Sequence, residues 1–513
     1  VTGVERYAAT GSAGTTVGAP PVGNGTTVQL VQSRIYVSGS RGAAGATGSR
    51  DEPLSTISAA VTMAATLYHP ATGYPDILIE GGSYAEQVTF NVPLRVFGSL
   101  DGDTWQHDVT QPTTILAPAY GTWFESLNAP ARLRDLEFVS GDAGASGNYG
   151  RATSSRAVYI SQCNAALNFR NCVFRSGQGG RGVDGWNFGS PGVDALSGFD
   201  GQSANLVPYE DKSGGIGGPV FISGQISGGA GGDGTAVTGG NSGGWPLRYE
   251  LISGFGFWFL ETCADPGDGG SLIGTTAVKS GSNGESGPDG ASGLGGTTRF
   301  YGGREFSDGR WESGAGDNGT SGENGCGGAG GGSGTGFAWW SPFPPTYFQW
   351  DGGGGGGGGA GGTGGDNGVG GTNGGGSFAV QMRLGSAVFK DCVFQPGRGG
   401  QGGRGGEGWA GGIGGQSGQG GSHFDGSFGA LGASVTLGLG AGGDGGRGGD
   451  GGHGGGGGGG HGGPSHSIFL GGNSAAPGAL VNGNTFLPGA GGVPGPGGFN
   501  GAAGSIGPDD VIK

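Results

Sequence analysis

The sequence predicts an all-β chain: a solenoid of short parallel strands that carries bundles of polyglycine-II helices as insertions. Three observations predict it. A short strand pattern recurs along the chain, no helical pattern separates its copies, and the glycine tracts keep a three-residue period. The 513 residues include 140 glycines and only 12% charged residues, but 10 Trp, 12 Tyr and 25 Phe must still be buried. Sparse charge with many aromatic residues argues against a disordered chain.

The recurring pattern is a six-residue stretch that ends in phenylalanine. It reads LRDLEF at 133–138, FRNCVF at 169–174 and FKDCVF at 389–394, with a weaker copy, VNGNTF, at 481–486. In the first three copies, Asp135, Asn171 and Asp391 each stand three residues before the phenylalanine. Such a residue suits a turn, so stacked rungs would align these side chains into a ladder. A second short strand precedes three of the copies, at 157–160, 378–382 and 467–470.

The glycine tracts keep phase, which a flexible linker has no reason to do. Non-glycine residues occupy every third position in 397–421, and one frame of three in 351–376 and 441–453. Elsewhere glycine itself is the third residue, in 141–150, 281–296, 316–334 and 489–507. A polyglycine-II helix has three residues per turn, and its bare faces let neighbouring helices exchange backbone hydrogen bonds. A collagen-like trimer, which relies on proline, and flexible disordered loops remain the alternatives.

These patterns divide the chain into four parts. We expect an N-terminal extended arm that could donate a strand (1–33), a cap with the first rungs (34–140), rungs with glycine-rich insertions (141–488) and a glycine-rich C-terminal tail (489–513).

The stretch RIYVSGSRGAAGATGSRDEPLSTI at 34–57, followed by SAAVTMAA, resembles the first rung of secreted bacterial proteins of the pectin-lyase-like superfamily. Segments 76–90 and 92–100 look like the following rungs. The resemblance implies a right-handed parallel β-helix with a cap helix, and it says almost nothing about activity. The glycine tracts resemble, in period only, the polyglycine-II bundles of phage tail-tip adhesins and of small glycine-rich ice-binding proteins.

Enzymes of such solenoids resemble this chain poorly at their active-site motifs. GHG occurs at 452–454 and 460–462 inside low-complexity glycine, an Asp pair stands at 509–510, and the NTD and RIK motifs of polygalacturonases are missing. We therefore expect no catalytic residues and no cofactor. Asp444, Asp450 and His453 do not complete a metal-binding repeat, because the calcium-binding nonapeptide needs an apolar residue that this tract lacks. We expect no metal site.

Charge, hydropathy and cysteine content limit the partners. The net charge is −15 without a Lys/Arg block, which disfavours nucleic acid, and no run of 18 apolar residues predicts a membrane span. Five scattered cysteines make neither a disulfide scaffold nor a zinc site. A chain that starts at Val1 is typical of a processed, exported protein, so we expect an extracellular or cell-surface location.

Two aromatic clusters are the candidate binding residues. They lie in 337–351 and 254–261, and each could form a subunit interface, a glycan-binding platform or a structural plug. The candidates are Trp339, Trp340, Phe343, Tyr347, Phe348, Trp350, Phe257 and Trp258.

We expect a structural extracellular protein, a subunit of a self-assembling filament or fibre that binds its own copies head to tail. The alternative is an adhesin of a cell surface or phage tail that binds glycans or a receptor. A polysaccharide lyase or hydrolase is the third hypothesis.

Overall fold

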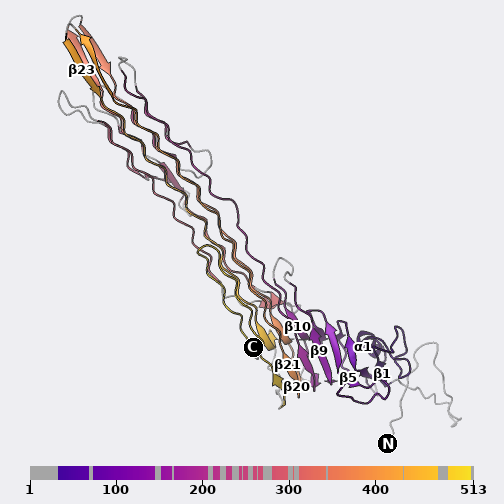
Figure 1. Ribbon diagram of the computed structural model, residues 1–513. Helices are drawn as coiled ribbons and strands as arrows, with labels where there is room; N and C mark the ends of the chain where they lie inside the picture. Colours follow the sequence, from indigo (N-terminus) through magenta and orange to yellow (C-terminus); the bar gives the residue numbers. More distant parts are fainter. Residues whose placement is uncertain are drawn as a thin grey trace, which may run out of the picture.

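A computed structural model gives the fold of most of the chain. It describes residues 33–68, 73–144, 152–163, 167–205, 212–219, 227–233, 242–244, 247–251, 258–262, 264–269, 280–298, 304–305, 311–312, 314–342, 345–430, 433–471 and 483–509. Within these residues strands predominate and there is one helix, which confirms the all-β prediction. Figure 1 shows a body of stacked strands from which a long glycine-rich rod projects.

Three parallel sheets form the body. The first contains β1 (Arg34–Val37), β2 (Asp76–Glu80), β5 (Arg95–Leu100), β8 (Ala131–Arg134), β11 (Leu167–Arg170) and β20 (Val388–Lys390). The second contains β3 (Gly82–Tyr84), β6 (Thr113–Ala117), β9 (Leu136–Ser140), β12 (Val173–Arg175), β21 (Val393–Gln395) and β25 (Thr485–Phe486). The third contains β4 (Thr89–Phe90), β7 (Thr122–Glu125), β10 (Ser155–Ser161), β19 (Ser377–Arg383) and β24 (Ser465–Gly471).

From β2 to β24 the strands of the body visit the three sheets in turn, so that each full circuit adds one strand to each sheet, and β25 then joins the second sheet. The registers place equivalent residues of successive circuits side by side. Phe169 pairs with Leu133 on one side and with Phe389 on the other, and Phe174 pairs with Phe138 and Phe394. The repeated six-residue stretch is therefore the turn from the first sheet into the second.

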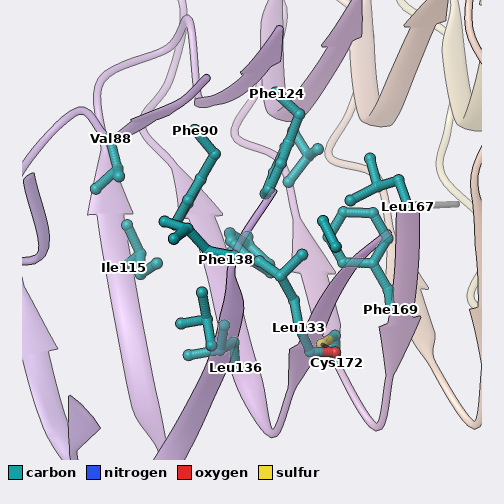
Figure 2. Close-up of a cluster of buried hydrophobic side chains, with 14 of the residues drawn as sticks. Val88, Phe90, Ile115, Phe124, Leu133, Leu136, Phe138, Leu167, Phe169 and Cys172 are labelled. Atoms are coloured by element: carbon teal, nitrogen blue, oxygen red, sulfur yellow. Dashed lines mark hydrogen bonds between the residues drawn. The ribbon is translucent and has the colours of Figure 1, made fainter. Parts of the chain in front are cut away.

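Columns of phenylalanine fill the space between the sheets (Figure 2). The ring of Phe174 stacks on Phe138 with centroids 5.4 Å apart and on Phe394 at 5.1 Å. Phe169 and Phe389 stack at 5.3 Å in the neighbouring column. All five side chains are buried, and burial of aromatic surface of this size is the main favourable term in such a core.

The helix α1 (Ile57–Thr66) lies between β1 and β2 in the chain and packs its apolar side on the first strands. Its buried residues, Ile57, Ala60, Val61 and Ala64, belong to the same core cluster. The Glu86 carboxylate accepts hydrogen bonds from the backbone N–H groups of Ile57 (2.7 Å) and Ser58 (2.9 Å). These donors lack partners within the helix, and a negative charge suits this end of its dipole.

Two long glycine-rich insertions leave the body at one corner, between the second sheet and the third. Residues 176–376 stand between β12 and β19, and residues 396–464 stand between β21 and β24. The rod therefore grows from a single edge of the body, and its segments start side by side.

In the described part of the glycine segments, four antiparallel hairpins interrupt them. They are β13 (Leu247–Leu251) with β14 (Trp258–Thr262), β15 (Arg304–Glu305) with β16 (Trp311–Glu312), β17 (Phe337–Pro342) with β18 (Pro345–Trp350), and β22 (Phe424–Ala430) with β23 (Ala433–Leu439). The last two lie at the distal end of the rod, where Figure 1 labels β23.

Candidate interaction surfaces

The segment 351–376 is the axis of the rod. Its N–H groups donate, in rotation, to three other segments: Gly353 to Gly440 O, Gly354 to Gln202 O and Gly355 to Gly232 O, at 2.8–3.0 Å. Toward the body the first two partners recur every three residues, whereas the third ends at Gly229, and the side-chain oxygens of Asn324 and Asn318 accept from Gly364 and Gly370 instead.

Its carbonyl groups accept from three further segments, again in rotation. The donors are Gly334, Gly421 and Gly215, which bond to the carbonyl oxygens of residues 353, 354 and 355 at 2.7–2.8 Å. The six neighbours also bond to one another around the ring. The run of eight glycines at 352–359 thus lies where the segment is surrounded by the backbone of its neighbours.

Steric contact explains which positions of this segment are glycine. A Cβ on Gly356 or Gly359 would fall on a carbonyl oxygen of segment 397–422, which accompanies 351–376 along nearly all of its length. At Gly354 and Gly357 the obstacle is the carbonyl of Ser213 or Ile216, in a short neighbour.

Past that short neighbour the same frame of three changes from glycine to side chains. The described part of the neighbour ends at residue 219, and the frame continues as Ala360, Thr363, Asp366, Val369 and Thr372. It returns to glycine at Gly375, where a Cβ would fall on the carbonyl oxygen of Thr153. The three-residue pattern therefore records which neighbour lies beside each face.

Where no backbone carbonyl is in reach of an N–H group, a side-chain oxygen accepts its hydrogen bond instead. Thr363 donates its N–H to Val193 O and accepts the Val193 N–H on Oγ1 at 2.5 Å. Thr372 makes the same two-bond clamp with Val183. Aspartates form further clamps: the carboxylates of Asp184, Asp194, Asp200 and Asp289 accept the N–H groups of Arg404, Ile413, Gln419 and Asp450 at 2.7–2.8 Å.

The three residues predicted as a turn ladder lie at equivalent turns of successive circuits. Asp135, Asn171 and Asp391 have φ of 56°, 53° and 55°, the left-handed region that Asp and Asn tolerate better than most residues. The Asn171 Nδ2 group donates to Asp135 Oδ1 at 2.6 Å. Asp391 faces the Arg170 Nε at 3.7 Å.

The first aromatic cluster forms the β17–β18 hairpin, whose register pairs Trp339 with Phe348 and Trp340 with Tyr347. Trp350 ends the hairpin and is buried, with 4% of its surface exposed. Phe343 lies outside the described residues. The structure thus brings the cluster to the distal tip, next to the β22–β23 hairpin.

The second aromatic cluster is separate from the first. Trp258 begins β14 and pairs with Leu251 of β13, whereas Phe257 lies outside the described residues. This hairpin leaves the rod between segments 242–244 and 264–268, which meet the bundle near Gly330 rather than at the tip. The two hairpins therefore join the rod at different places along its length.

The described residues contain no group of three or more His, Cys, Asp or Glu side chains placed to hold a metal ion. Asp444 and Asp450 accept backbone N–H groups, from Gly420 and Gly414 respectively, at 2.8 Å. The ring of His453 packs against Phe499, with centroids 4.1 Å apart. Each of the three side chains has a structural contact.

Cys163, Cys172 and Cys392 are buried free thiols, and Cys326 is disulfide-bonded. Cys172 and Cys392 stack in one column, where each sulfur contacts a carbonyl of the preceding circuit, Leu133 O or Phe169 O, at 3.7 Å. Burial raises the pKa of Cys172 well above that of a free thiol, and burial likewise raises the pKa of Cys163. Cys172 is thus kept as the protonated thiol, the unreactive form.

Comparison of the chain with models of protein families, with curated protein sequences and with solved structures finds no match in any of the three. Among the described residues there is also no helix with the length and hydropathy of a membrane span.

Proposed function

We propose that this chain is a structural extracellular protein, a subunit of a self-assembling filament or surface fibre. The observation that carries the proposal is the segment 351–376, whose backbone bonds to six neighbours and leaves no room for side chains on most faces. Such an arrangement supplies stiffness over length. At 3.1 Å per residue this segment would reach about 80 Å.

In this proposal the body is a right-handed parallel β-helix and the rod is a bundle of polyglycine-II helices. The regular visits to three parallel sheets support the first assignment, since parallel crossover connections are nearly always right-handed. The three-residue rotation of hydrogen-bond partners supports the second, because polyglycine II has three residues per turn.

Head-to-tail growth would use the ends of the body. The arm 1–33 lies outside the described residues except Ser33, and it joins the body at β1. We propose that it adds a strand to the next subunit. Electron microscopy of the full chain and of a variant without residues 1–33 tests this: filaments are expected from the first only. If both proteins form filaments equally well, the arm has no role in assembly. If the full chain stays a monodisperse monomer at high concentration, the filament proposal is rejected.

The distal aromatic hairpin favours a second candidate, an adhesin that binds glycans or a receptor through its tip. Trp339, Trp340, Tyr347 and Phe348 are cross-strand neighbours there, and aromatic residues are typical of binding hot spots. A glycan array probed with the full chain and with a Trp339→Ala/Trp340→Ala variant separates the two functions. Binding that the variant loses supports the adhesin, and no binding by the full chain contradicts it.

A further inference from the structure

One face of the rod carries apolar side chains where they are not needed to build the bundle. In segment 177–204 the glycine frame faces the axis: a Cβ on Gly192 or Gly198 would fall on the carbonyl of Thr363 or Gly357. A second frame, which contains Asp194 and Asp200, faces segment 397–422 through its carboxylates. The third frame points away from both segments.

That outward frame contains Trp186, Val193, Leu196 and Phe199, which we call the apolar row; the phase shifts by one residue between Trp186 and Val193. All four are exposed, Trp186 by 62% and Phe199 by 57%. The row continues sideways onto the next segment, because the Phe199 N–H donates to Ile216 O at 2.8 Å and the Ile216 side chain is 69% exposed.

The equivalent outward frame of segment 397–422 is mostly polar. It reads Arg398, Gln401, Arg404, Glu407, Ala410, Ile413, Gln416 and Gln419. Both segments have the same period and both pack on the axis, so the bundle accepts polar side chains at such positions. The apolar row therefore needs an explanation other than packing of the rod.

The size of the row fits a protein interface. Side chains of Trp and Phe bury about 150–250 Å² each, so Trp186, Phe199 and the neighbouring Phe188, all more than half exposed, offer roughly 300–400 Å². Val193, Leu196 and Ile216 extend this toward the about 800 Å² per partner of a standard interface. Monomeric proteins rarely expose contiguous apolar patches larger than about 300–600 Å².

The spacing of the row fits a second copy of the same chain. Residues three apart along the segment recur about every 9 Å in a straight line. An identical row on a second rod has the same spacing, so two rods can interdigitate along their length through a twofold, self-complementary contact. We propose that the apolar row is the surface through which two copies of this chain associate side by side along their rods.

This inference deepens the proposed function, since it names a surface through which copies associate. The test compares the full chain with a Trp186→Gln/Phe199→Gln variant by sedimentation velocity over a concentration series and by electron microscopy. The control variant is Leu294→Gln/Ile506→Gln, which removes apolar residues that are 75% and 71% exposed on other segments.

We expect the row variant to associate at least tenfold more weakly than the wild type, and the control to associate like the wild type. Unchanged association of the row variant, or an equal loss in the control, overturns the inference. So does a lower melting temperature of the monomeric row variant, because the row would then be covered by its own chain.

The outcomes separate this inference from the proposed function. If the row variant forms filaments as well as the wild type does, the proposed filament stands and the apolar row is not the surface of association. If the wild type forms a discrete dimer but no filaments, and the row variant does not dimerise, the apolar row is the surface of association and the proposed filament is rejected. If the wild type stays monomeric at high concentration, both the proposed filament and the proposed role of the apolar row are rejected.

Discussion

A single methyl group on the axis of the rod is expected to be costly. In Gly359→Ala the new Cβ falls on the carbonyl oxygen of Gly415, far inside the about 3.5–4.0 Å at which carbon atoms attract. Because only backbone lies there, the segments must move apart, and overpacking of this kind costs about 1–3 kcal/mol. The melting temperature should fall accordingly.

The matched control is Gly144→Ala, where a Cβ has no atom within 4 Å. This substitution should leave stability unchanged or raise it slightly, because alanine restricts the unfolded chain. Equal losses in the two variants would contradict the steric explanation of the glycine pattern.

The turn residue Asp135 combines a left-handed backbone with a side-chain bond to Asn171. Asp135→Gly loses the bond but relieves the backbone, whereas Asp135→Val loses the bond and keeps a strain of about 1–2 kcal/mol. We therefore expect the valine variant to unfold at a lower urea concentration than the glycine variant. The reverse order would show that the turn conformation is not what selects the residue.

The buried thiol of Cys172, which lies between neighbouring circuits, should make the body sensitive to alkali. The pKa of Cys172 is raised by burial in the folded state, so the folded protein holds its proton more tightly than the unfolded chain does. This stabilisation is complete below the pKa of a free thiol, about 8.5, and is lost as the pH rises above it.

Urea unfolding at pH 7 and pH 10 measures this loss. It should be smaller in Cys172→Val, which keeps an apolar side chain of similar size, and Cys163→Val should show its own smaller reduction because burial also raises the pKa of Cys163. A pH dependence that neither substitution alters would assign the effect to other groups.

At the level of the elements, the sequence predicted strands better than their arrangement. The strand pattern at 157–160, 378–382 and 467–470 is realised as β10, β19 and β24, each longer by two or three residues. The six-residue repeat was recognisable because its final phenylalanine and its turn residue recur in three circuits. The sequence did not show that these stretches join two different sheets. Strand pairing follows from contacts between circuits, which the local pattern does not encode.

Some residues of the candidate sites could likewise be predicted from the sequence, and others could not. The turn residues Asp135, Asn171 and Asp391 were visible from their fixed place before phenylalanine. The clamps of Thr363 and Asp194 were not, since their partners lie 170 or more positions away in the chain. The apolar row was also missed, although its signal, apolar residues three apart at 193, 196 and 199, stands in the sequence.

Over the whole molecule, amide hydrogen exchange should be slowest on the axis of the rod. Residues 353–358 of segment 351–376 donate to and accept from backbone on all sides, and the rest of the segment bonds to backbone on most sides, whereas segment 489–508 lies at the edge of the bundle. Mass spectrometry after deuterium labelling should show stronger protection in the first segment than in the second. Fast exchange throughout 351–376 would instead identify it as a linker.

Because the two long glycine-rich insertions leave the body and return to it at the same corner, the reach of the rod is adjustable only in matched steps. Adding three residues to an outgoing segment lengthens it by about 9 Å and keeps its glycines in phase. Its returning partner must gain three residues as well, or side chains would meet backbone along the rest of the bundle. Insertions and deletions during the evolution of such chains should therefore come in multiples of three and in correlated pairs, as the lengths of two arms of one hairpin do.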